Sequence, residues 1–167
     1  FLNNSGSLPT MVKFLCVDTN KGDLEIKNNE GPEGLTSLER LHLSVSDPMA
    51  ALNDGGAAFD WIPKSNRDSV VDIEGTGAGQ VRSNGRFILE DCENKHGSFS
   101  ERLNQLYTQL TAVTNTDPNY DLLPATNIDI HLIFSIAGGT GSGMFLSIAN
   151  LIRRHIPKAN IMAYAFS

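Results

Sequence analysis

IHLIFSIAGGTGSGMFLSIANLIRRH, residues 130–155, joins a strand-like run to a helix-like run through a cluster of glycines. Its first residues are mostly apolar and β-branched or aromatic, which is typical of a buried strand. After the glycines, apolar residues recur at helical spacing until Pro157 ends the pattern. A strand that turns through glycines into a helix presents free backbone amides at the helix N-terminus, where phosphate binds favourably. We therefore predict a phosphate-binding loop over residues 137–143, although a glycine-rich turn can also serve only for close packing.

The segments around this loop predict an alternation of strands and helices. A strand, a helix and a second strand at this spacing form a parallel βαβ unit. The predicted fold class is therefore α/β, a Rossmann-like parallel sheet with helices on both faces. The predicted strands are residues 11–17, 128–136 and 161–166, and the predicted longer helices are residues 84–95, 98–113 and 144–155.

Short sequence patterns predict helix starts, loops and turns in the rest of the chain. Asp47 followed by Pro48 predicts a helix start, and Ser98 or Ser100 is a candidate cap for the helix predicted over residues 98–113. Residues 36–45 fit either a short helix or a strand, and the pattern does not separate them. The predicted loops and irregular segments are residues 21–34, residues 55–74 and a turn at residues 117–119.

Composition restricts the classes of function. The chain has 167 residues, enough for one domain, and a formal net charge of −6, which disfavours nucleic acid and anionic membranes as direct partners. No apolar run is long enough to span a membrane, and residues 1–10 do not resemble a signal peptide. Cys16 lies in a strand-like run and Cys92 is far from it in sequence. We interpret Cys16 as a buried thiol of a reducing compartment and expect a cytoplasmic protein.

Two common phosphate-binding motifs do not fit the glycine cluster. The P-loop pattern requires a lysine directly after its last glycine, and none occurs here. The dinucleotide pattern G-x-G-x-x-G requires two residues between its last glycines, whereas Gly139, Gly141 and Gly143 alternate with single residues.

Three segments, in order along the chain, carry a resemblance to a known family. GGTGSG at residues 138–143 resembles the tubulin/FtsZ signature GGGTG[ST]G, with Ala137 in place of the first glycine. VKFLCVDTN at residues 12–20 is similar to the FtsZ-type strand and loop "EFIAINTD". GTGAGQVRSNGR at residues 75–86 is similar to "GLGAGANPEIGR". On these segments the chain is identified as a member of the tubulin/FtsZ superfamily, as a divergent tubulin-like protein.

The resemblance implies a site for GTP or GDP with Mg²⁺. The residues that it implies for the α- and β-phosphates are Gly138, Gly139, Thr140, Gly141, Ser142 and Gly143. The residues that it implies for sensing the γ-phosphate are Gly77, Ala78 and Gly79. The residues that it implies near the phosphates and Mg²⁺ are Asp18, Thr19 and Asn20, in which Asp and Asn are exchanged relative to the family order.

Other polar and aromatic residues are weaker candidates. Asn84 and Arg86 could lie near the nucleotide, although an arginine near a helix start is more often solvated. We interpret His131 and His155 as structural. Phe59 and Trp61 are expected to pack in the core rather than to stack on a base.

The departures from the family pattern are also informative. Residues 21–74 form a segment longer than in FtsZ, which we interpret as an insertion within a partial GTP-binding domain spanning residues 1–167. The family's first glycine-rich loop is expected before Phe1, and its base-reading helix and acidic catalytic loop are expected after Ser167. The resemblance implies head-to-tail self-association into filaments, with GTPase activity completed by a neighbouring subunit. A non-hydrolysing nucleotide-binding scaffold and, more distantly, a Rossmann-type enzyme for another phosphate ligand remain alternatives.

Overall fold

The structure is a computed structural model, and it describes residues 10–26, 35–71, 77–112 and 128–167. Its strands form two parallel pairs. Strand β1 (Cys16–Asp18) pairs with β2 (Arg40–His42), and β3 (Asp129–Ser135) pairs with β4 (Asn160–Phe166). The predicted α/β class with parallel strands is confirmed.

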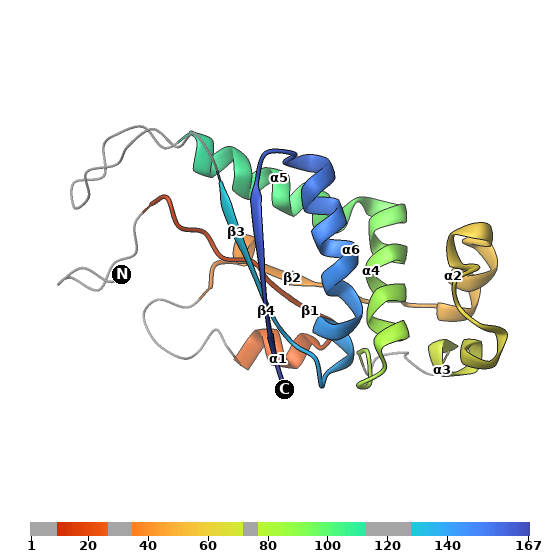
Figure 1. Cartoon of the computed structure of the whole chain (residues 1–167). Coiled ribbons are helices and arrows are strands. Elements are labelled where there is room, and N and C mark those ends of the chain that lie inside the picture. Colours follow the sequence, from red (N-terminus) through yellow and green to blue (C-terminus); the bar gives the residue numbers. More distant parts are fainter. Residues whose placement is uncertain (1–9, 27–34, 72–76, 113–127) are drawn as a thin grey trace.

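Helix α6 (Gly139–His155) connects β3 to β4, so these elements form the predicted βαβ unit. Helix α4 (Arg82–His96) lies beside α6, and both helices stand on one side of the strands (Figure 1). Helix α5 (Ser98–Thr111) follows α4 after the single residue Gly97, which adopts a left-handed conformation with φ of 59°. The remaining helices are α1 (Lys21–Ile26), α2 (Pro48–Asp54) and α3 (Arg67–Val71), with short 3-10 turns at Ser37–Glu39, Gly56–Phe59 and Lys64–Asn66.

One cluster of buried apolar side chains joins these elements. Phe59 and Phe87 lie in it with ring centroids 4.8 Å apart, and Trp61 packs against it from the side. The packing roles predicted for Phe59 and Trp61 are therefore confirmed. The segment predicted as an insertion contributes Leu43 and Leu52 to the same cluster. The described part of this segment therefore belongs to the core.

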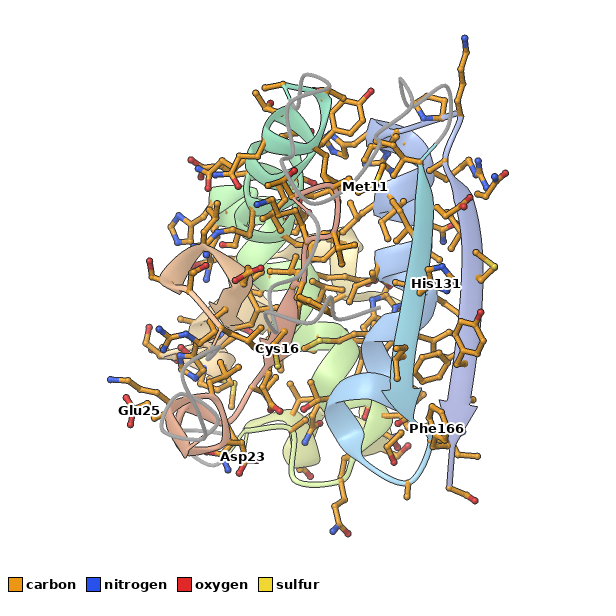
Figure 2. All side chains as sticks on the ribbon, turned by 90° about the vertical axis from the view of Figure 1, so that its left-hand side faces the viewer. Met11, Cys16, Asp23, Glu25, His131 and Phe166 are labelled. Carbon is orange, nitrogen blue, oxygen red and sulfur yellow. The ribbon has the colours of Figure 1, made fainter. Side chains whose placement is uncertain are left out.

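The two faces of the β3–β4 pair differ. Alternate residues such as Leu132 turn toward α6 and the core, while Ile133 on the opposite face is 72% exposed and Phe166 is 59% exposed. Figure 2 shows the two strands from their more exposed face, with His131 labelled on β3 and Phe166 labelled on β4. His131 stacks on Tyr164 with centroids 5.6 Å apart. His131 therefore makes a contact between the two neighbouring strands.

Several predicted boundaries are wrong. The first strand covers Cys16–Asp18 instead of residues 11–17, because it has parallel partners only at the three residues of β2. Residues 21–34 are not all loop, since α1 begins at Lys21 with Leu24 buried, and residues 27–34 lie outside the described residues. The predicted turn at residues 117–119 also lies outside them.

The ambiguous segment at residues 36–45 contains both structures that its pattern allowed. Thr36 and Glu39 form a capping box around a 3-10 turn, and Arg40–His42 continue directly as β2. Glu39 accepts hydrogen bonds from Thr36, and the pKa of its carboxyl is lowered. Burial raises this pKa, but the bonds from Thr36 and from the amide of Phe14, together with the charge of Lys13, outweigh that effect.

The predicted helix caps have different outcomes. Asp47 accepts a 2.8 Å hydrogen bond from the amide of Ala50 and Pro48 opens α2, as predicted. The prediction of a serine cap on α5 is wrong. Glu93, in the preceding helix, accepts the free amides of Phe99 and Ser100 at 3.0 and 3.2 Å. The Glu93 carboxylate of α4 thus supplies the hydrogen-bond acceptor that a serine hydroxyl at the start of α5 would otherwise provide.

Cys16 and Cys92 do not form a disulfide with each other. Cys92 is buried, and burial raises the pKa of its thiol. Cys16 is only partly buried, so the prediction of a buried thiol at that position is too strong. In the part of the chain that the structure describes, no helix is long and apolar enough to cross a membrane.

Candidate functional site

The end of β1 turns sharply into α1. The side chain of Asp18 accepts the amide of Asn20, and the side chain of Asn20 accepts the amide of Gly22, each at 3.0 Å. These two local bonds shape the loop. Between these two residues Thr19 points inward and is only 4% exposed, while its carbonyl oxygen lies 3.2 Å from Nε2 of His42.

The second predicted loop is a tight turn before α4. Gly77 and Gly79 have φ angles of 73° and 57°, and Gln80 follows with a φ of 62°. A positive φ costs glycine little, so the two glycines are required by the backbone, whereas Gln80 carries some strain. Ala78 between the glycines is buried, and its amide donates to the side-chain oxygen of Thr19.

The third predicted loop is shorter than expected because α6 begins at Gly139. Gly138 is the N-cap residue, with extended φ and ψ of −87° and 164°. Gly139, Thr140 and Gly141 form the first turn, whose amides have no partner within a helix. The prediction placed the helix start near Met144, because glycines argue against a helix. Here they occupy its first turn instead.

The two hydroxyl residues of this loop have different environments. The hydroxyl of Ser142 donates to the carbonyl oxygen of Gly138, and Ser142 is buried. The side chain of Thr140 is partly exposed, and its oxygen lies 2.8 Å from that of Thr19. Thr140 is therefore the hydroxyl of this loop that is placed to reach a ligand.

The three predicted loops meet at Thr19. Its hydroxyl oxygen accepts the amide of Ala78 at 3.0 Å and lies 2.8 Å from the hydroxyl oxygen of Thr140. These residues are 59 and 121 positions away from it in sequence. The structure thus brings together the segments that the resemblance assigned to one nucleotide site.

The surroundings of the glycines in the third loop differ, and so does the reason why each position holds a glycine. A Cβ on Gly143 would overlap the carbonyl oxygen of Arg82, and a Cβ on Gly139 would lie 2.7 Å from the amide of Val81. Gly141 is close to β3, since a Cβ there would lie 3.0 Å from the Cβ of Phe134. By contrast, a Cβ on Gly138 would have nothing within 4 Å. Packing thus explains three of these glycines, and leaves Gly138 with open space beside its backbone.

A family model described as tubulin-like matches residues 3–167. The chain belongs to the tubulin-like family. Neither a curated protein nor a solved structure gives a match. The superfamily predicted from the three short segments is confirmed over nearly the whole chain.

The weaker candidates of this tubulin-like chain include two residues of α4 and one at the end of α6. Arg86 forms a 2.7 Å ion pair with Glu90 and lies over the ring of Trp61, 4.0 Å from its centroid. These two contacts hold its side chain, which is 42% exposed. Asn84 is buried within α4, and His155 is exposed at the end of α6.

Sequence reasoning missed two residues near the loops. Arg82 donates to the carbonyl oxygen of Ile136 at 3.3 Å, which places a guanidinium beside the third loop. Gly85 lies against the backbone of Gly139, where a Cβ would overlap the carbonyl oxygen. The signal for Gly85 was present, since it aligned with a glycine of the family segment. No pattern identified Arg82.

The loops fit a phosphate group better than they fit a metal ion alone. Free amides, a partly exposed hydroxyl and open space at Gly138 suit phosphate oxygens. Within the described residues no cluster of three His, Cys, Asp or Glu side chains could hold a metal. Asp18 is the carboxylate of the first loop, and one of its oxygens already accepts the Asn20 amide. Because Mg²⁺ commonly uses one carboxylate together with substrate phosphates, its predicted place depends on a bound nucleotide.

Two hollows in the described surface are lined by residues outside the three loops. One, beside α1, is lined by Lys21, Arg40 and His42 among others. The other, of about 370 Å³, lies between α4 and α6 and is lined by Arg86, Glu93 and Arg154 among others. Charges of both signs line each hollow, so neither is selective for an anion.

Proposed function

We propose that the chain forms the phosphate-binding side of a guanine-nucleotide site. The observation that carries the proposal is the meeting of three separate loops at Thr19, two of them rich in glycine. Membership of the tubulin-like family supports the choice of GTP and GDP over other phosphate ligands. Gly138 to Gly141 would bind the α- and β-phosphates through amides, helped by the positive end of the α6 dipole.

The turn at residues 77–80 would sense the γ-phosphate. The amide of Ala78 is already bonded to Thr19, so the available donors of this turn are the amides of Gly79 and Gln80, which have no acceptor among the described residues. This refines the predicted trio of Gly77, Ala78 and Gly79. In the refined proposal Gly77 and Ala78 fix the turn, and Gly79 presents an amide.

Mg²⁺, when bound with the nucleotide, would neutralise part of the phosphate charge. Asp18 would take part in its coordination, with Asn20 beside it. Thr19 differs from both, since it points into the protein and serves to connect the loops.

Hydrolysis would need a group that the described residues of these loops do not supply. Around the three loops, the described carboxylate is Asp18, which shapes its own turn. We propose that a neighbouring subunit completes catalysis in a head-to-tail filament, so that nucleotide state and assembly are coupled. Because the described residues place no second carboxylate at these loops, the second candidate is a tubulin-like scaffold that binds nucleotide without hydrolysing it.

GTP hydrolysis by the purified full-length protein, measured over a range of protein concentrations, tests this part of the proposal. We expect the rate per protein molecule to rise with concentration, because each active site needs a second subunit. ATP serves as the control substrate and should be hydrolysed much more slowly. A rate per molecule that stays constant contradicts catalysis between subunits. Tight GTP binding without hydrolysis at any concentration supports the scaffold.

A further inference from the structure

The buried hydroxyl of Thr19 lies between two groups whose hydrogen-bonding roles can be assigned. A threonine hydroxyl has one proton to donate and can accept two hydrogen bonds. The amide of Ala78 can only donate, so Thr19 accepts that bond. The other neighbour is the hydroxyl of Thr140, which could act in either role.

Burial decides between the two roles. Thr19 is 4% exposed, and among the described residues its hydroxyl has these two partners alone. If Thr140 donated to Thr19, the proton of Thr19 would remain buried without an acceptor among the described residues, which is costly. If Thr19 donates to Thr140, every group is satisfied. The proton of Thr140, which is partly exposed, is then free to point outward at the start of α6.

We infer that Thr19 is a positioning residue that turns the hydroxyl of Thr140 into a directed donor for the ligand. The hydrogen bonds run in one direction, from the Ala78 amide to Thr19, from Thr19 to Thr140, and from Thr140 to a phosphate oxygen. This inference rests on the proposed function, because it requires an anionic ligand at the first turn of α6. It adds a residue that acts on the ligand without touching it.

The same chain of bonds connects two loops that bind different parts of the ligand. Polarisation along consecutive hydrogen bonds strengthens each of them. A ligand that accepts from Thr140 therefore strengthens the bond that holds Ala78 and the turn at residues 77–80. Thr19 is thus a coupling point between the α/β-phosphate loop and the γ-phosphate turn.

A double-mutant cycle for GTP binding tests the inference. The variants are Thr19→Ala, Thr140→Ala and the double variant, since alanine removes each hydroxyl without placing a methyl group against its neighbour. We expect Thr140→Ala to weaken GTP binding about tenfold and Thr19→Ala about fivefold, from the usual strength of hydrogen bonds to charged groups. The double variant should lose less affinity than the product of the two single losses, because Thr19 acts in part through Thr140. Thr19→Ser should restore the wild-type affinity.

Controls separate this role from a merely structural one. Thr108→Ala on α5, whose hydroxyl bonds the carbonyl of Asn104, should leave GTP affinity unchanged. If Thr19→Ala does not fold, Thr19→Val measured against Thr19→Ser gives the same comparison. Losses that multiply to about fiftyfold in the double variant overturn the inference while leaving the proposed function intact. A wild-type protein that binds no GTP contradicts the proposed function and the inference with it.

Discussion

Gly143→Ala should lower the free energy of unfolding by about 2 kcal/mol, the usual cost of forcing an extra group into a packed contact. Alanine is intrinsically the better helix former, so without this contact the substitution would be stabilising. A Cβ at this position would overlap the carbonyl oxygen of Arg82 and lie 3.0 Å from the amide of Arg86. Both atoms belong to the backbone of α4, so the clash is relieved only by moving α4 away from α6. Urea denaturation of the full-length protein measures the loss.

The matched control lies in the same loop. Gly138→Ala should leave the free energy of unfolding within about 0.5 kcal/mol of wild type, since its Cβ meets no atom. Its backbone is extended, a conformation open to any residue. Equal stability of Gly143→Ala and wild type would show that α4 and α6 are not packed as described.

Gly138→Ala should instead weaken GTP binding about tenfold or more. The open space beside Gly138 is where we propose that phosphate approaches the backbone, and a methyl group there holds the ligand away from the amides. Loss of one charge-assisted hydrogen bond accounts for a change of this size. Isothermal titration of the full-length protein with GTP measures it, with Thr108→Ala as a variant remote from the loops.

A loss of stability in Gly143→Ala and a loss of GTP affinity in Gly138→Ala would show that one glycine of this loop serves packing and the other serves binding. Unchanged GTP affinity in Gly138→Ala, together with unchanged stability, would favour the alternative that the glycines serve only for close packing. In that case the ligand, if there is one, lies elsewhere.

The order of the longer elements could be predicted from sequence because their signals are local, although α1 and α3 lie in segments predicted as loop or irregular. The β3–α6–β4 unit follows from apolar periodicity and a short connection. Gly77 and Gly79 proved to have the positive φ angles that make glycine necessary. The family assignment came from the order of three segments, and the match over residues 3–167 confirms it.

The predictions that were wrong concern features that depend on contacts between segments far apart in the sequence. The length of β1 is set by its partner β2, and the N-terminal cap of α5 is a carboxylate from another helix. Neither has a signal in its own segment. Likewise, the inward position of Thr19 and the close approach of Gly85 to Gly139 arise only when α4 and α6 pack together. The family resemblance implied that these loops lie together in one site. It did not identify the Thr19 hydroxyl at which they meet.

Hydrogen exchange of the full-length protein with and without GTP tests most directly whether the three loops form one nucleotide site. We expect amides in residues 18–20, 77–81 and 138–141 to gain protection together at the same GTP concentration, and ATP to have a much weaker effect. Protection of only one of these segments, or protection confined to other parts of the chain, would contradict the account.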